Sequence, residues 1–205
     1  MLDILTRALR HPVDYAAIRR VTTLRFKERI QENENTYSFI FTASKLPDWK
    51  AGQHAIFTLP GKRVSDPNAG ARASKTWRPF SVASAPHERE IRIGTIIPPE
   101  PSSFKQCLIS LRPGEPARMY GPYGELYIRP SMQKVVAVAG GIGITPFRSI
   151  IADMACEGKD IDFHLIYSAK ADHVYKSELD DWKAKLPHLR ITYTHTPEEV
   201  NAELE

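Results

Sequence analysis

The hydrophobic pattern of this 205-residue chain changes character at Pro130. Before this point, several short segments alternate apolar and polar side chains, which is typical of strands buried on one face. After it, apolar runs such as residues 134–140 are followed by helical patterns, which is typical of parallel strands covered by helices. We therefore expect a helical extension over residues 1–20, a β-rich lobe over 21–130 and an α/β lobe over 131–205.

The first lobe is predicted to be a small antiparallel β-barrel. Its short strands are separated by proline and glycine turns such as Lys50-Ala51-Gly52 and Arg112-Pro113-Gly114. One stretch, residues 102–111, has a helical pattern instead. Six or so strands with one helix describe such a barrel. The strands are expected at residues 23–31, 36–43, 54–60, 78–84, 90–97 and 117–128.

The second lobe is predicted to be a parallel sheet with helices between its strands. Its strands are expected at residues 134–140, 162–168 and 190–196, and its helices at 146–157 and 177–185. In front of both lobes, apolar residues recur at helical spacing. A helix packed on the barrel is preferred there over a membrane-surface helix, because Pro12 keeps it short. The apolar residues concerned are Leu2, Ile4, Leu5, Ala8 and Leu9.

The composition excludes several functions. Cys107 and Cys156 are the only cysteines and stand far apart, so no thiolate cluster can hold an iron–sulfur centre or a structural zinc, and no metal site is expected. The net charge of +4 favours acidic partners. Nucleic-acid binding is not indicated, because the sequence shows no clusters of basic and aromatic side chains. No apolar run has the length of a signal peptide or a membrane span, so we expect a cytoplasmic protein without membrane association.

A glycine-rich turn follows the first strand of the second lobe. Gly140, Gly141 and Gly143 precede Thr145 and Pro146, which we expect to be the N-cap and first residue of a helix. Glycines before a helix N-terminus let the backbone approach an anion and direct N–H groups at it, which predicts a phosphate or pyrophosphate site. The turn matches neither the Rossmann fingerprint nor the P-loop. A tight turn without a ligand is the alternative.

A second motif, Arg78-Pro79-Phe80-Ser81, lies on a predicted barrel strand. An arginine beside an aromatic ring and a hydroxyl offers a bidentate phosphate clamp, a stacking surface and a hydrogen-bond donor. An exposed edge strand without a ligand is the alternative interpretation.

Together and in this order, these motifs resemble the ferredoxin-NADP reductase-like family of flavin and pyridine-nucleotide oxidoreductases. RPFS is similar to the family's flavin motif, GPYGEL to its barrel-closing turn and AGGIGITP to its nicotinamide-side glycine loop. The resemblance covers residues 22 to about 196. It implies an NAD(P)H-dependent reductase that holds FAD between its lobes, takes hydride from NADH or NADPH and passes electrons to a separate acceptor.

The resemblance also implies roles for particular residues. Arg78 would neutralise the flavin phosphate, with Pro79 beside it, and Phe80 would flank the flavin ring where the family usually has tyrosine. Ser81, the catalytic candidate, would donate a hydrogen bond near the reactive N5. A second phosphate contact is expected at the start of the predicted helix 102–111. Backbone contacts to the flavin are expected on the predicted strand 90–97. These further residues are Ser102, Ser103, Phe104, Thr95 and Ile97.

On the nucleotide side, the resemblance implies that the glycine turn receives the pyrophosphate of the nicotinamide dinucleotide. Ser168 and Thr196, at the ends of the second and third strands, are counted as further contacts. NADPH-preferring relatives place Ser-Arg where this chain has Thr196-Pro197, followed by Glu198-Glu199. Two carboxylates would repel a ribose phosphate, which favours NADH.

One large departure from the family pattern leaves alternatives open. The family's second lobe continues to a strand with a Cys-Gly-Pro motif that this sequence lacks, so we expect a fragment with an incomplete sheet. The rival function is a flavin-binding interaction subunit of an electron-transfer complex without turnover.

A basic segment between Leu59 and Trp77 could steer a small acidic electron-transfer protein. A solvated loop is the alternative for this segment, whose charges are Lys62, Arg63, Arg72 and Lys75.

Overall fold

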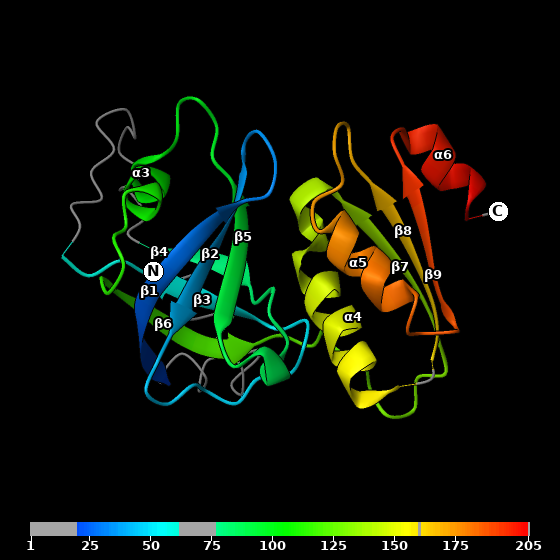
Figure 1. Ribbon diagram of the computed structural model, residues 1–205, viewed down its shortest axis with the longest axis horizontal. Coiled ribbons are helices and arrows are strands. Elements are labelled where there is room, and N and C mark those ends of the chain that lie inside the picture. The colour runs from blue at the N-terminus through cyan, green and yellow to red at the C-terminus, as the bar shows by residue number, and fades with distance from the viewer. Residues whose placement is uncertain (1–19, 62–76, 160, 205) are drawn as a thin grey trace, which may run out of the picture.

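The computed structural model describes residues 20–61, 77–159 and 161–204, which form two lobes side by side (Figure 1). The predicted N-terminal helix and the basic charges of residues 62–76 lie outside the described residues. Within the described ranges, no helix is long and apolar enough to cross a bilayer. No group of three or more His, Cys, Asp or Glu side chains suited to a metal ion was found among them either.

The first lobe is a six-stranded antiparallel sheet with the order β4-β3-β6-β1-β2-β5. The sheet curves around a core of buried aromatic and aliphatic side chains, among them Phe39, Phe41 and Phe57. The edge at β5 is joined to the chain just after β4, because the Ala83 amide donates to the Arg92 carbonyl at 2.7 Å. The elements are β1 (Val21–Gln31), β2 (Thr36–Thr42), β3 (His54–Thr58), β4 (Trp77–Ser81), η1 (Pro86–Glu88), β5 (Ile91–Ile96), α3 (Ser103–Ile109) and β6 (Pro116–Tyr123).

The second lobe is a three-stranded parallel sheet with the order β7-β8-β9. Figure 1 shows α4 and α5 on the side of this sheet that faces the barrel, while α6 lies at its far side, against β8 and β9. The edge strand β7 leaves Val136 and Val138 half exposed. The elements are β7 (Lys134–Gly140), η2 (Gly141–Ile144), α4 (Thr145–Glu157), β8 (Asp162–Ser168), α5 (Lys176–Lys183), β9 (Leu189–Thr194) and α6 (Pro197–Ala202).

The fold therefore confirms the predicted antiparallel β lobe and parallel α/β lobe. All nine strands of the described residues were expected, although β4 and β6 end earlier than the sequence pattern indicated, at Ser81 and Tyr123. The short helix α6 was not expected. Residues 197–202 carry too little apolar periodicity to reveal it, and its start is fixed by Thr196, whose hydroxyl accepts from the Glu199 amide at 3.3 Å.

The prediction that Thr145 is the N-cap of its helix is wrong. The preceding residues Gly141–Ile144 already form a 3-10 turn, so Thr145 has helical dihedrals and Ile144 occupies the cap position. The Thr145 hydroxyl donates to the Ile142 carbonyl at 3.1 Å. The helical geometry therefore begins at the glycines. Their N–H groups lie in the first turn, where N–H groups have no acceptor within the helix.

Candidate functional site

One part of the site gathers two cations and two aromatic rings between β4 and α3. The ring centroids of Phe80 and Phe104 are 6.1 Å apart, and the Arg78 guanidinium carbon lies 5.5 Å from the Phe104 centroid. Lys105, next to Phe104, donates to the Ile96 carbonyl at 2.7 Å. Two segments that the sequence assigned to one flavin thus meet.

Partial burial, together with the positive charge of Arg78, lowers the pKa of Lys105 below its usual value. Two cations that disfavour each other's charge make a site whose electrostatic energy falls when an anion binds between them. This fits a phosphate group.

The remaining predicted flavin residues belong to β4, to β5 with the residue that follows it, and to the start of α3. Pro79 is exposed and Ser81 half-buried at the end of β4. Thr95 is buried on β5, and Ile97 packs against the barrel core. Ser103 is buried, whereas Ser102 occupies the N-cap position of α3 without a side-chain capping hydrogen bond. The Ser102 hydroxyl is therefore not engaged in capping its own helix.

The glycine turn opens onto unfilled space. A Cβ added at Gly140, Gly141 or Gly143 would meet no atom within 4 Å, and Gly141 has a φ of +49°, which favours glycine. The parallel register sets Gly140 beside Ser168 of β8. Pro146 follows in the first turn of α4, where its missing N–H costs nothing. A backbone of this kind can be approached closely by a bound phosphate.

The two parts of the site meet at Gly94, in the middle of β5. A Cβ there would lie 2.5 Å from the Tyr175 hydroxyl, 2.8 Å from Cγ2 of Thr145 and 3.1 Å from Cδ1 of Ile142. The predicted flavin strand and the predicted nucleotide turn are thus in direct contact. Sequence reasoning missed Gly94, although a glycine inside a strand is itself a signal of close approach.

After β9, the strand farthest from β7 in the sheet, the predicted contact Thr196 serves as the N-cap of α6. Glu199 reaches back, accepting from the His195 amide at 2.8 Å. Thr194, two residues before the cap, is 2 % exposed, and its hydroxyl has no hydrogen-bond partner. Ser168 of β8 pairs with Thr194 of β9 and with Gly140 of β7. The three residues thus lie at the same, carboxyl-terminal edge of the sheet.

Sequence reasoning also missed an ion cluster that joins the lobes. Arg148 of α4 is 1 % exposed and contacts carboxylates of both lobes, Glu88 and Glu178. Arg92 of β5 also pairs with Glu178, at 2.9 Å. Burial lowers the pKa of Arg148, but its hydrogen bonds to Glu178 and Glu88 outweigh burial and raise it. No local pattern predicts such partners.

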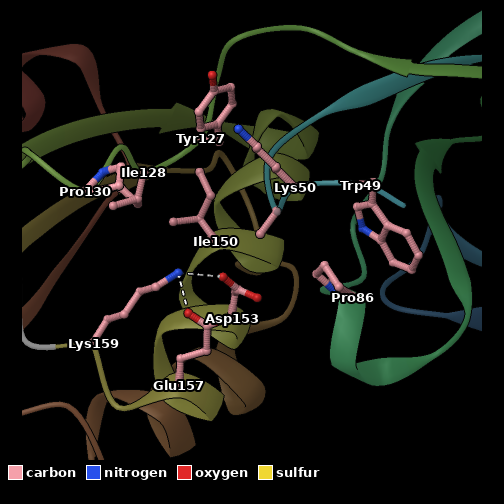
Figure 2. A pocket seen from close by; sticks show the side chains of 11 residues that line it. Trp49, Lys50, Pro86, Tyr127, Ile128, Pro130, Ile150, Asp153, Glu157 and Lys159 are labelled. Atoms are coloured by element: carbon pink, nitrogen blue, oxygen red, sulfur yellow. Dashed lines mark hydrogen bonds and ion pairs between the residues drawn. The ribbon is translucent and has the colours of Figure 1, made fainter. Parts of the chain in front are cut away.

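A cavity of about 430 Å³ lies elsewhere between the lobes, beside the Lys50-Ala51 turn and α4 (Figure 2). Figure 2 shows Lys159 turned back to Asp153 and Glu157, at 3.0 and 2.6 Å. None of the predicted site residues lines it. The remaining wall is largely apolar and consists of Trp49, Pro86, Tyr127, Ile128, Pro130 and Ile150.

Comparisons with known proteins agree with this geometry. Residues 137–204 match the family model of the oxidoreductase NAD-binding domain. The chain is 31% identical to the heme-dependent oxidative N-demethylase beta subunit of Ectopseudomonas mendocina, covering 82% of this chain and 48% of that protein. It is 28% identical to an NADH-cytochrome b5 reductase-like protein of Arabidopsis thaliana, covering 81% and 51%. The chain thus spans about half the length of these curated relatives.

Among solved structures, ferredoxin-NADP+ reductase of Plasmodium falciparum superposes with a TM-score of 0.72 at 12% identity, covering 89% of this chain and 78% of that one. A barrel in contact with an α/β lobe that matches an oxidoreductase NAD-binding domain is the architecture of two-lobed pyridine-nucleotide oxidoreductases. The chain thus has the fold of the ferredoxin-NADP reductase-like family, as its motifs indicated.

Proposed function

We propose that this chain binds FAD between its lobes, takes hydride from NADH and passes the electrons to a separate acceptor. The contact at Gly94 carries this proposal, because it brings the flavin strand β5 against the turn that would hold the nucleotide. Hydride transfer needs the two reacting rings within a few ångströms of each other. A junction between the two binding segments supplies that proximity.

The barrel residues suit the flavin. Arg78 and Lys105 hold its phosphates, and the Ser102 hydroxyl adds a donor at the start of α3. Phe80 flanks the ring; it retains the stacking surface of the family's tyrosine but not the phenol hydroxyl. We choose FAD over FMN because two phosphate contacts are available, one on β4 and one at α3.

Ser81 is the catalytic candidate. It ends β4, opposite His54 in the register. Its hydroxyl would donate a hydrogen bond to the flavin near N5. When bound, the flavin supplies the exchange between two-electron hydride chemistry and single-electron transfer. The protein contributes position, charge and exclusion of water.

The second lobe suits a nicotinamide dinucleotide. Gly140, Gly141 and Gly143 let the pyrophosphate approach backbone N–H groups at the helical N-terminus. Ser168 lies beside Gly140, and Thr196 begins α6, whose first turn carries Glu198 and Glu199. Their charge disfavours a ribose phosphate, so NADH is preferred over NADPH. The name of the Arabidopsis relative also specifies NADH.

The acceptor is a separate protein or other external acceptor. We propose a small acidic electron-transfer protein, steered by the basic residues of the segment between Leu59 and Trp77. Reduction of such a protein should then slow with rising salt, because exposed charges are screened. A rate that does not depend on salt would contradict steering.

Visible spectroscopy tests the central proposal. The purified protein should show flavin absorption, and NADH added under argon should bleach it. Heat release and chromatography should then identify FAD. A colourless protein that fails to take up added FAD would contradict the flavin site.

A second function is favoured by one comparison. The N-demethylase relative is named a beta subunit, which matches the alternative of a flavin-binding interaction subunit without its own turnover. The same experiment separates the two, because a yellow protein that NADH does not bleach would select the subunit. Bleaching selects the reductase.

A further inference from the structure

Arg148 uses every donor that a guanidinium has. Its Nε donates to Glu178 at 2.7 Å, and its Nη2 donates to Glu178 and Glu88 at 2.9 Å each. Its Nη1 donates to the Ala83 carbonyl at 2.8 Å and to Glu88 at 2.9 Å. A guanidinium has five N–H donors in a rigid plane. Any rotation of this side chain would therefore break at least one of these hydrogen bonds.

These acceptors come from both lobes. Glu178 belongs to α5, next to α4 in the second lobe, whereas Glu88 and Ala83 belong to the barrel. Ala83 stands two residues after Ser81, the end of the proposed flavin strand. The neighbouring residue of α4, Ser149, donates to the Ser84 carbonyl at 2.7 Å. Helix α4 is thus bonded directly to the segment that continues the flavin motif.

A second arginine approaches the same carboxylate from the barrel. Arg92 of β5 donates to Glu178 at 2.9 Å and to Ser38 at 3.1 Å. Ser38 also shares a hydrogen bond of 2.9 Å with the Tyr175 hydroxyl of the second lobe. The Tyr175 ring lies 5.1 Å from the Arg92 guanidinium carbon and 5.5 Å from that of Arg148. The cluster therefore reaches strand β5 and the segment directly after β4, and both strands carry proposed flavin contacts.

The cluster is suited to fixing a geometry. A buried ion pair loses much of its Coulombic gain to desolvation, so it adds little net stability compared with apolar packing. Its hydrogen bonds are directional, however, and bidentate pairs allow few arrangements. Helix α4 begins at the glycine turn, so a fixed α4 gives that turn a fixed position against β4 and β5.

We propose that Arg148 is a positioning residue that sets the glycine turn against the flavin strands through Glu88 and Ala83. This inference rests on the proposed function where it concerns hydride transfer, but the holding of the lobes is testable without it. Positioning errors of about 1 Å can slow a reaction by about 100-fold. Loss of the cluster should therefore affect the rate of hydride transfer more than the affinity for NADH.

Spin-label distances test the holding of the lobes directly. One label is placed on Cys156, which is exposed on α4, and the other on Glu28→Cys of the barrel, with Cys107→Ser to prevent a third label. Arg148→Lys and Glu88→Gln should broaden the distance distribution between the labels. Glu88→Gln keeps hydrogen-bonding capacity, so it serves if the lysine variant does not fold.

Glu32→Gln is the matched control. Its partner at 2.9 Å is Arg92, and both residues belong to the barrel, so the variant weakens a buried pair of the same cluster within one lobe. The inter-lobe distances should then stay as in the wild type. Unchanged distributions in both Arg148→Lys and Glu88→Gln would overturn the holding role.

Stopped-flow reduction of the FAD-loaded protein tests the consequence. We expect Glu88→Gln to slow reduction by NADH at least about 10-fold while the dissociation constant for NADH changes less than about 2-fold. Broadened distances with an unchanged rate would overturn positioning for hydride transfer. If the wild type itself is not reduced by NADH, the proposed function fails, and the distances alone decide whether Arg148 holds the lobes.

Discussion

At the scale of single residues, the proposed phosphate clamp depends on Arg78. Replacing it by alanine removes one of two neighbouring cations, and with it the charge-assisted hydrogen bond proposed to the flavin phosphate. We expect Arg78→Ala to weaken FAD binding by about 1.5–3 kcal/mol, or roughly 10- to 150-fold. Titration of apoprotein with FAD, followed by flavin fluorescence, measures the loss. Arg129→Ala, which removes an exposed pair with Glu125, should leave affinity unchanged. Equal affinity in both variants would reject the clamp.

Gly94 allows a second prediction at this scale. In Gly94→Ala the new Cβ would lie under 3.0 Å from Tyr175 and Thr145, so packed groups must shift. We expect a loss of about 1–3 kcal/mol in the free energy of unfolding, as for other overpacked sites. Urea denaturation measures it. Gly140→Ala meets no atom and should leave stability nearly unchanged while weakening NADH binding. Similar unfolding curves for the wild type and Gly94→Ala would contradict the close junction.

At the scale of elements, α6 bears on the choice of nucleotide. Its first turn carries Glu198 and Glu199, and Glu199 is also engaged with the His195 amide. Glu198→Gln removes one exposed negative charge without breaking that bond. We expect the preference for NADH over NADPH to fall roughly 2- to 5-fold, because an exposed charge acts weakly through water. Anaerobic titration with each nucleotide measures both affinities.

Glu125→Gln, an exposed carboxylate in the segment between the lobes, is the control for this effect. Tighter binding of NADPH than of NADH by the wild type would show that the predicted preference is wrong. An identical shift in both variants would assign the effect to net charge rather than to α6.

At the scale of the whole molecule, the contact between the lobes should weaken in acid. Burial raises the pKa of Glu178, but hydrogen bonds and charge from Arg148 and Arg92 outweigh it and lower the pKa below the ordinary 4.5. A carboxyl with a lowered folded-state pKa stabilises the fold above about pH 4.5, and this contribution disappears as the pH falls through the lowered pKa. We expect the free energy of unfolding to fall as the pH drops below about 4.5, and to fall less steeply in Glu178→Gln.

Urea denaturation across this range measures the slope. Asp162→Asn is the control. This half-buried carboxylate pairs loosely with Lys134 at 3.9 Å and Arg190 at 3.5 Å, both well exposed and in the same lobe, so the variant should nearly retain the wild-type slope. If the free energy of unfolding changes with pH as steeply in Glu178→Gln as in the wild type, protonation of Glu178 does not cause the acid destabilisation.

The sequence by itself determined the strands of the described residues and the two kinds of sheet that they form, but not helix α6. Alternating side chains specify strands buried on one face, and solid apolar runs specify parallel strands, because each pattern can bury its apolar surface in few ways. The motifs around Arg78 and Gly141 could also be recognised from the sequence, because each consists of consecutive residues; their assignment to flavin and nucleotide stays a prediction. The cap of α4 was misassigned because the glycines themselves adopt helical geometry, which glycine's broad conformational freedom leaves open.

Only the tertiary structure decided how the lobes meet. Arg148 and Ala83 are 65 residues apart in the chain, and Arg92 and Glu178 are 86 apart. No local pattern selects such partners, because a guanidinium can pair with any carboxylate that folding brings within reach. The same holds for Gly94, whose neighbours Tyr175 and Thr145 come from the other lobe. Local patterns can thus be recognised in neighbouring residues. The contact between the segments proposed to bind flavin and nucleotide depends instead on long-range packing and hydrogen bonds.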